Sequence, residues 1–275
     1  MDALRETFGF VDAPIHEQYF TYVGNLLQGN FGTSITAFPA PVTQVIGNAL
    51  VWTLRLAGTA TIVSFAVGTL LGVFAAWKRG KFADSFVLPV LSFIGAFPYF
   101  FVAMLLLYTL AFGLKIFPLS HAYDLNLPVN WSDPTFVMSV LKHAALPVFT
   151  IVITGMSGWM LGMRNNMIGV LGEDYIVMAQ AKGLSDRRVM FTYAARNAIL
   201  PSVTGFAMSL GFVIGGALLT EIVFSYPGIG FWLLSAVNAR DYPLMQGIFL
   251  MITMAVLLAN FMADVVYVML DPRAR

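Results

Sequence analysis

Long runs of uncharged, mostly apolar residues alternate along this chain with short polar segments. A helix that crosses the hydrocarbon core of a bilayer needs about 20 consecutive apolar residues. Five runs are long enough, and they predict five membrane-spanning helices: Leu56–Trp77, Val87–Phe112, Ala144–Met163, Asn197–Thr220 and Pro243–Ala263. The fold class that follows is an all-α polytopic membrane protein.

A further uncharged run, Ile222–Ala239, contains the sequence Ser225-Tyr226-Pro227-Gly228. Proline removes a backbone donor and clashes with the preceding turn inside a helix. We therefore predict a re-entrant or interfacial element here rather than a span.

Basic residues are distributed unevenly between the two sides, and cytoplasmic loops carry the excess of lysine and arginine. With five spans, one side holds Lys78, Arg79, Lys81, Arg164, Lys182, Arg187, Arg188, Arg196, Arg273 and Arg275, whereas the other holds Arg5, Lys115, Lys142 and Arg240. The richer side is predicted to be cytoplasmic. The C-terminus then lies in the cytoplasm and the chain in the inner (cytoplasmic) membrane.

This orientation places residues 1–50 outside, ahead of a membrane domain that covers residues 51–275. Apolar side chains recur at helical spacing in the outer segment, namely Tyr19, Phe20, Val23, Leu26 and Leu27. Such a stripe is typical of a helix on the outer membrane interface, and equally of one packed against the bundle. Met1–Phe10 lacks the features of a signal peptide, so we expect the native product to begin upstream with one further apolar span.

The composition narrows the function classes. Hydrophobic residues make up 59% of the 275 positions and charged residues 11%, against about 25% charged in soluble domains. The net charge of +1 offers no basic surface for nucleic acid, and the absence of cysteine removes disulfides and thiolate chemistry. A soluble enzyme, a disordered linker and a nucleic-acid binder are excluded. The histidines are too scattered for a metal site: His16, His121 and His143.

The largest polar segment, from about residue 164 to 200, is predicted to form a cytoplasmic helix–turn–helix elbow. Glu173 and Asp174 favour a helix start, Gly183 can end that helix, and Ser185 can cap the next one. The turn Ala179–Leu184 contains small residues that would let another protein approach the backbone. From the residues alone, a docking site and a solvated loop are equally good interpretations.

Two carboxylates and a glycine pair stand beside or inside the predicted spans. Glu221 and Asp264 flank the fourth and fifth spans, where a charge must face protein, water or headgroups. We favour a structural role for both over substrate contact. Gly158 and Gly162 are four residues apart, a spacing that permits close helix packing.

Several segments resemble one transporter family. Glu173–Leu184 and Arg196–Pro201 are similar to the cytoplasmic EAA-motif loop of ABC importer permeases, and more narrowly to the B-type subunit of the dipeptide/oligopeptide/nickel family. Further segments resemble the same family: Gln28–Ser34, Glu221–Gly230, Arg240–Pro243, Asp264–Tyr267 and Leu270–Arg273. In two respects the chain departs from the family pattern. The glutamate of the general motif falls on Val177, and the family's first span, which should precede Met1, is missing.

The resemblance implies the transmembrane domain of a type I ABC importer, whose core of six spans is represented here by five. It implies a second, C-type permease, two cytoplasmic ATPases that bind ATP and Mg, and an external substrate-binding protein. Coupling to the ATPases would fall on Tyr175, Ala179, Gln180, Ala181, Lys182, Gly183 and Leu184. Structural or gating candidates are Glu221, Pro227, Gly228, Gly230, Arg240, Asp241 and Asp264. The expected substrates are peptides, or a related solute such as nickel or an oligosaccharide.

Two rival functions make different demands on the sequence. A membrane-embedded enzyme, such as a lipid transferase or an intramembrane protease, would need convergent acidic, histidine or Ser/Lys groups inside the spans, and none is found. An ion-coupled secondary transporter usually has a larger chain with internal repeats, and no repeat is visible. The sequence also lacks a G-x-x-x-x-G-K-[ST] nucleotide loop, so ATP hydrolysis is assigned to partner subunits.

Overall fold

The computed structural model describes residues 13–211, 213 and 217–270 of the chain. These residues form helices joined by turns and by two longer loops, residues 28–41 and 114–133, and no β-strand occurs among them. The helices are α2 (Ile15–Leu27), α3 (Val42–Thr53), η1 (Leu54–Gly58), α4 (Thr59–Trp77), η2 (Ala83–Val87), α5 (Leu88–Gly95), α6 (Tyr99–Leu106), η3 (Leu107–Gly113), α7 (Pro134–Leu171), α8 (Asp174–Ala181), α9 (Asp186–Arg188), η4 (Val189–Ala195), α10 (Arg196–Ala198), α11 (Leu200–Gly211), α13 (Leu218–Val223), α14 (Ile229–Ala239) and α15 (Tyr242–Leu270), where η marks a π-helical segment.

Three helices in the described part of the chain are long and apolar enough to cross a membrane, namely Val42–Trp77, Pro134–Leu171 and Tyr242–Met262. The first two contain the first and third predicted spans, and the last covers the fifth except for Ala263. The first begins at Val42, well ahead of the predicted Leu56, because α3, η1 and α4 follow one another without a break. Pro147 lies inside α7 without ending it.

The second predicted span is wrong as a single straight helix. The helical segments Ala83–Gly95 (η2 and α5) and Tyr99–Gly113 (α6 and η3) are long and apolar enough for one span only together, and a bend of 98° separates them. Pro98 precedes α6 with an extended ψ of 128°. Proline offers no N–H to the preceding turn and disfavours helical geometry in the residue before it, so the helix ends at this point.

The fourth predicted span is not one helix in the described residues either. α11 has 12 residues, and α13 is a separate helix of 6 residues. Residues 212 and 214–216, which lie between the two helices, are outside the described part. The predicted count of five spans is therefore not confirmed, since these residues hold three such helices, or four if the bent pair counts as one.

α4 and α7 pack closely because two glycines of α4 face α7. A Cβ on Gly68 would lie 2.6 Å from the carbonyl oxygen of Met156, and a Cβ on Gly72 would lie 2.5 Å from that of Met160. Small residues of this kind let helix backbones approach in a membrane. The predicted packing pair was different. No atom of the described residues lies within 4 Å of a Cβ placed on Gly158 or Gly162, so these two do not pack against another helix in that part of the chain.

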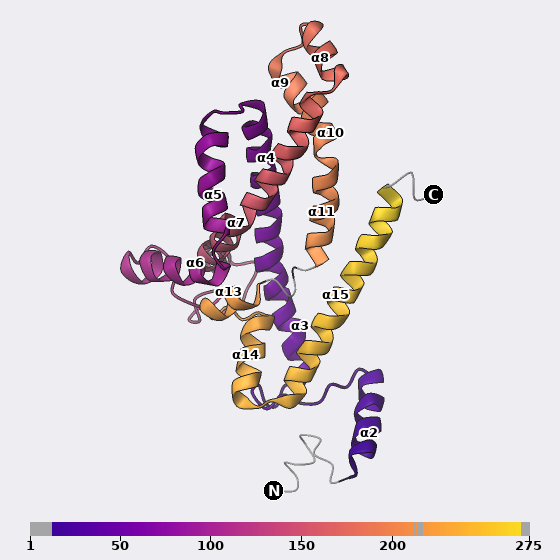
Figure 1. Cartoon of the computed structure of the whole chain (residues 1–275). Coiled ribbons are helices and arrows are strands. Elements are labelled where there is room, and N and C mark those ends of the chain that lie inside the picture. The colour runs from indigo at the N-terminus through magenta and orange to yellow at the C-terminus, as the bar shows by residue number, and fades with distance from the viewer. Residues whose placement is uncertain (1–12, 212, 214–216, 271–275) are drawn as a thin grey trace.

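The helices give the molecule two distinct ends (Figure 1). At the α8 end, α8 and α9 cap the tops of α7 and α11, and buried residues of α4, α7, α8 and η4 share one apolar cluster. At the α14 end, α14 packs with α3 and α15 in a second cluster. α6 projects sideways from the bundle between these two ends.

The amphipathic stripe near the N-terminus forms α2. None of the side chains of α2 is buried, and Tyr19 and Phe20 are 62% and 71% exposed. α2 stands apart from the main bundle in Figure 1. Val23 and Leu26 are half-buried, and the placement of α2 on a membrane interface stays a prediction.

Candidate functional site

The elbow predicted around residues 164–200 is present as a helix–turn–helix at the α8 end. α8 follows the end of α7 after a short turn, with Glu173 in extended geometry at its N-terminal boundary. Ser185 occupies the matching boundary position before α9, although its side chain makes no capping hydrogen bond. η4 and α10 then lead into α11. The elbow therefore has two helical arms, α8 and the run from α9 to α10, joined by one tight turn.

Gly183 closes the first arm of the elbow. Its φ of +72° is left-handed, and its N–H donates to the carbonyl oxygen of Gln180 at 2.9 Å. The N–H of Leu184 donates to the carbonyl oxygen of Ala179 at 3.4 Å. These paired bonds form a Schellman motif, which favours glycine because a Cβ is strained in the left-handed region.

α8 has one buried face and one exposed face. Ile176 and Ala179 are buried in the cluster that α8 shares with η4. Ala179 is only 3% exposed, so it does not belong to the docking surface that its small size suggested. The exposed face carries Gln180, Ala181 and Lys182 together with the apolar Val177 and Met178.

Sequence reasoning missed Val177 and Met178 as candidate contact residues. They are 56% and 57% exposed at the tip of a membrane protein. The available signal was the helical period: if Ile176 and Ala179 point inward, the two residues between them point out. Tyr175 is half-exposed, and its hydroxyl accepts a hydrogen bond of 3.2 Å from the Asn197 side chain.

The opposite end of the molecule contains a buried carboxylate, Glu221. It is fully buried, and its Oε2 accepts a 2.7 Å hydrogen bond from the N–H of Gly230 in the first turn of α14. The Thr53 hydroxyl accepts from the neighbouring N–H of Ile229 at 2.9 Å. Side chains of α13 and α3 thus satisfy the first donors of α14, which would otherwise lack partners.

Glycines around Glu221 are required by space rather than by backbone angle. A Cβ on Gly228 would collide with the Glu221 carboxyl group, and a Cβ on Gly230 would lie 2.5 Å from the carbonyl oxygen of Leu218. Pro227 is half-buried in the turn between α13 and α14. The predicted residues Glu221, Pro227, Gly228 and Gly230 therefore lie together in one tightly packed turn.

Asp241 is the second buried carboxylate at the α14 end. Its Oδ2 accepts from the Ser34 hydroxyl at 2.6 Å and from the N–H of Thr36 at 2.9 Å, and its Oδ1 accepts from the N–H of Leu244 at 3.1 Å. Two segments more than 200 positions apart are thereby joined. Neighbouring Arg240 is exposed, with a left-handed φ of 55°. Asp264 lies in α15, and the placement of its side chain is outside the described part.

Comparison with known proteins identifies the family of this chain. Residues 68–275 match the family described as "Binding-protein-dependent transport system inner membrane component". The chain belongs to this family. It is therefore a multi-pass permease subunit of an ABC importer.

Relatives of this permease include proteins named as peptide permeases. It is 35% identical to the di/tripeptide transport system permease protein DppB of Pseudomonas aeruginosa, over 96% of the chain and 82% of the relative. It is also 35% identical to the oligopeptide transport system permease protein AppB of Bacillus subtilis, over 98% and 83%. Among solved structures, a crystal structure of an amino acid ABC transporter with histidines matches with a TM-score of 0.54 at 14% identity, over 81% of this chain and 92% of the other. That likeness concerns the fold.

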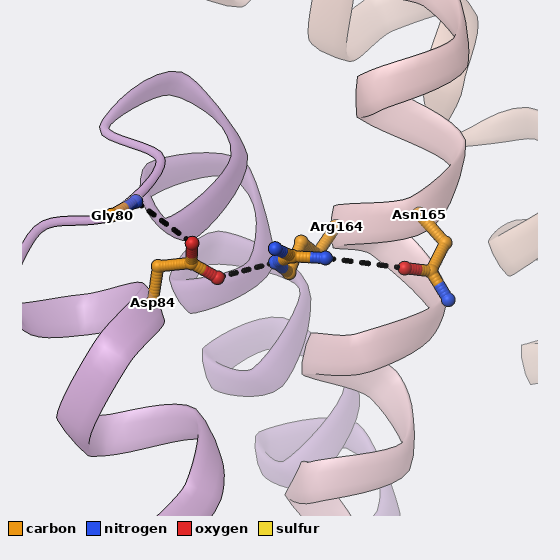
Figure 2. Close-up of polar contacts among 4 residues, drawn as sticks. All are labelled: Gly80, Asp84, Arg164 and Asn165. Carbon is orange, nitrogen blue, oxygen red and sulfur yellow. Dashed lines mark hydrogen bonds and ion pairs between the residues drawn. The ribbon is translucent and has the colours of Figure 1, made fainter.

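The permease has one ion pair among its described residues, and it supports the elbow. Figure 2 shows Asp84 of η2 facing Arg164 of α7, whose Nε donates to Asp84 Oδ1. The other carboxylate oxygen accepts from the N–H of Gly80 at 2.8 Å. The pair fixes the turn after α4 to α7, a little before α7 reaches the elbow. No local pattern could have paired residues 80 positions apart.

The bend between α5 and α6 borders a hollow of about 490 Å³. Its lining includes Gly95, Phe97 and Tyr99 on the bend and Thr154 and Gly155 on α7. Thr154 lies at the middle of the third predicted span. Interrupted backbone at such depth is tolerated where it is covered by protein or lines a water-filled cavity.

Proposed function

We propose that this permease forms, with a second, C-type permease, the membrane path through which peptides enter the cell. Two separate ATPases, which bind ATP and Mg, drive the cycle, and an external binding protein delivers the substrate. The chain performs no catalysis of its own. The observation that carries the proposal is family membership together with peptide permeases at 35% identity over nearly the whole chain.

The α8 end supports an assignment as the ATPase-docking side. α8 presents the exposed Val177, Met178, Gln180, Ala181 and Lys182 beyond the ends of α7 and α11. Such a mixed apolar and polar face on a short rigid helix is suited to insertion into a partner protein. Tyr175, Gly183 and Leu184 position that face, and Ala179 anchors it from beneath.

The α14 end is then assigned to the outside, where substrate arrives. The buried contact of Glu221 with Gly230 joins α13 to α14, and that of Asp241 with Ser34 joins the turn before α15 to the segment that precedes α3. Arg240 and Pro227 lie in these turns. We assign Glu221, Gly228, Gly230 and Asp241 to the frame of the outer gate.

The test is reconstitution of the assembled transporter in proteoliposomes. The two permeases, the two ATPases and the binding protein encoded with this chain are purified together. Labelled di- and tripeptides, nickel and an oligosaccharide are then offered with ATP inside the vesicles. We expect ATP-dependent peptide uptake that requires the binding protein. Uptake of nickel or oligosaccharide without peptide uptake would reassign the substrate.

A matched variant tests the docking side. Met178→Asp places a charge on the exposed face of α8, whereas Met138→Asp places the same charge on an exposed position of α7 far from the elbow. We expect Met178→Asp to lose co-purification of the ATPases. Equal loss in both variants would show that the defect is not specific to α8.

A further inference from the structure

Arg55 lies on η1, between α3 and α4 within the long helix Val42–Trp77, and its guanidinium carbon lies over two aromatic rings. The guanidinium carbon is 3.8 Å from the centroid of Trp131 and 5.5 Å from that of Trp52. A guanidinium that lies flat on an indole gains cation–π attraction through its face. Its N–H donors, which lie in the plane of the group, are left free to bind a ligand.

The aromatic platform under Arg55 is held by neighbouring rings from several segments. Trp52 stacks on Tyr123 at 5.8 Å and meets Tyr226 edge-on at 5.9 Å. Trp131 meets Phe136 edge-on at 5.2 Å, and Phe136 is fully buried. The rings beneath the guanidinium group are therefore held in place by contacts with other aromatic residues.

No anion in the described part of the chain neutralises Arg55. The ion pair formed there joins Arg164 to Asp84 instead, and none of the hydrogen bonds between described residues uses an Arg55 donor. Asp133, two residues after Trp131 in the chain, accepts hydrogen bonds from the Thr135 hydroxyl and N–H at the start of α7, and these bonds lower the pKa of its carboxyl. Glu221 is buried and bonded to Gly230. The five donors of an arginine, arranged in a planar fork, are thus unused.

We propose that Arg55 binds the C-terminal carboxylate of a peptide as it enters the path from the outside; this inference rests on the proposed peptide function. Peptides differ in every side chain but share this terminal carboxylate. A planar guanidinium binds a carboxylate through two parallel hydrogen bonds, so one residue can recognise the whole substrate class. The adjacent rings of Trp52 and Trp131 offer an apolar surface that tolerates different side chains.

The experiment compares uptake of a free-acid tripeptide with uptake of the same tripeptide carrying a C-terminal amide. Both are measured in proteoliposomes with the complete transporter, and the ratio of acid to amide uptake defines the selectivity. Because the binding protein is the same in every sample, its own preference cancels when variants are compared. We expect Arg55→Met to reduce the ratio roughly tenfold, by removing one charge-assisted bidentate contact. Arg55→Lys should keep part of it.

Lys115→Met is the matched control, because Lys115 is an exposed basic residue on the loop that leads to Trp131. Its loss should leave the ratio unchanged. If the Arg55→Met transporter does not assemble, the ratio of acid to amide uptake is judged on Arg55→Lys alone. An ammonium group cannot form the bidentate contact, so this variant should also lower the ratio. An unchanged ratio in a transporting Arg55 variant overturns the inference while leaving the proposed function intact. Absence of peptide uptake by the wild-type transporter overturns both.

Two further outcomes also count against the inference. Equal loss of acid and amide uptake would mean that Arg55 holds the fold or the binding protein. Arginine and tryptophan also gather at membrane interfaces. If the effect of Arg55→Met appears only in vesicles that contain phosphatidylglycerol, and not in neutral phosphatidylcholine vesicles, the ligand is a lipid phosphate.

Discussion

Gly183 combines a left-handed backbone with open space around it. Its φ is +72°, and no atom from the described part of the chain lies within 4 Å of the position that a Cβ would take. A side chain there is strained by about 1–2 kcal/mol through the backbone alone. We expect Gly183→Val to insert normally, because no apolar run changes, but to weaken ATPase docking or to uncouple hydrolysis from transport. Uptake and ATPase pull-down at equal membrane levels measure this.

Gly162→Ala is the control for Gly183→Val. Gly162 lies inside α7, and among residues 13–211, 213 and 217–270 no atom would contact the added methyl group. We expect a milder effect than that of Gly183→Val. Full transport and normal ATPase binding by Gly183→Val would show that the turn Ala179–Leu184 does not couple the two proteins, and a solvated loop would then describe it better.

Asp241 is the residue on which the outer contacts converge. Asp241→Ala leaves three donors without their acceptor, on Ser34, Thr36 and Leu244, and an unsatisfied buried donor costs about 1–3 kcal/mol. Ser34→Ala removes one of the three. We therefore expect a clear fall in melting temperature for Asp241→Ala and a smaller one for Ser34→Ala, measured by thermal unfolding of the purified complex. Equal shifts would contradict the central role of Asp241.

At the scale of elements, the contact between α4 and α7 depends on the absence of a side chain. Gly72→Ala would place a Cβ 2.5 Å from the carbonyl oxygen of Met160, so the two helices must separate. Overpacking of this kind costs about 1–3 kcal/mol. Gly158→Ala adds the same methyl group in open space. We expect a lower melting temperature for Gly72→Ala and little change for Gly158→Ala. A normal melting temperature for Gly72→Ala would show that the helices are farther apart than described.

The ion pair between Asp84 and Arg164 joins η2 to α7. Their side chains are 8% and 19% exposed, so the pair is poorly solvated. A double-mutant cycle with Asp84→Asn and Arg164→Met should give a coupling energy of about 0.5–3 kcal/mol, the range for residues in one network. Thermal unfolding measures the stability of the wild type, of the two single variants and of the double variant. Additive effects of the two substitutions would show that the pair contributes nothing to the attachment of α7.

For the whole molecule, the orientation across the membrane is the prediction with the widest consequences. Reporter fusions after Lys81, Arg188 and Arg275 should report the cytoplasm, because basic residues concentrate on that side. A fusion near Asp124 should report the outside. An external signal at Arg188 would place the elbow away from the ATPases and would overturn the proposed coupling.

Membrane character, the three long helices and the elbow could be predicted from local sequence. Apolar length alone predicts α7 and α15, because a bilayer requires about 20 apolar residues per crossing. Gly183 and Ser185 mark the elbow through helix-end chemistry that acts within four residues. The family motifs pointed to the segments around Glu221 and Asp241, although they could not name the partners Thr53 and Ser34.

The sequence by itself determined what depends on neighbours along the chain: apolar length, helix ends and the predicted sidedness. Only the tertiary structure decided what depends on neighbours in space. Ala179 is buried because η4 packs over it, and Gly72 rather than Gly162 meets a second helix. The chain bends at Pro98 between α5 and α6, whereas α7 continues through Pro147. Which face of a helix is covered, and which proline is tolerated, depends on packing partners that are far away in the sequence.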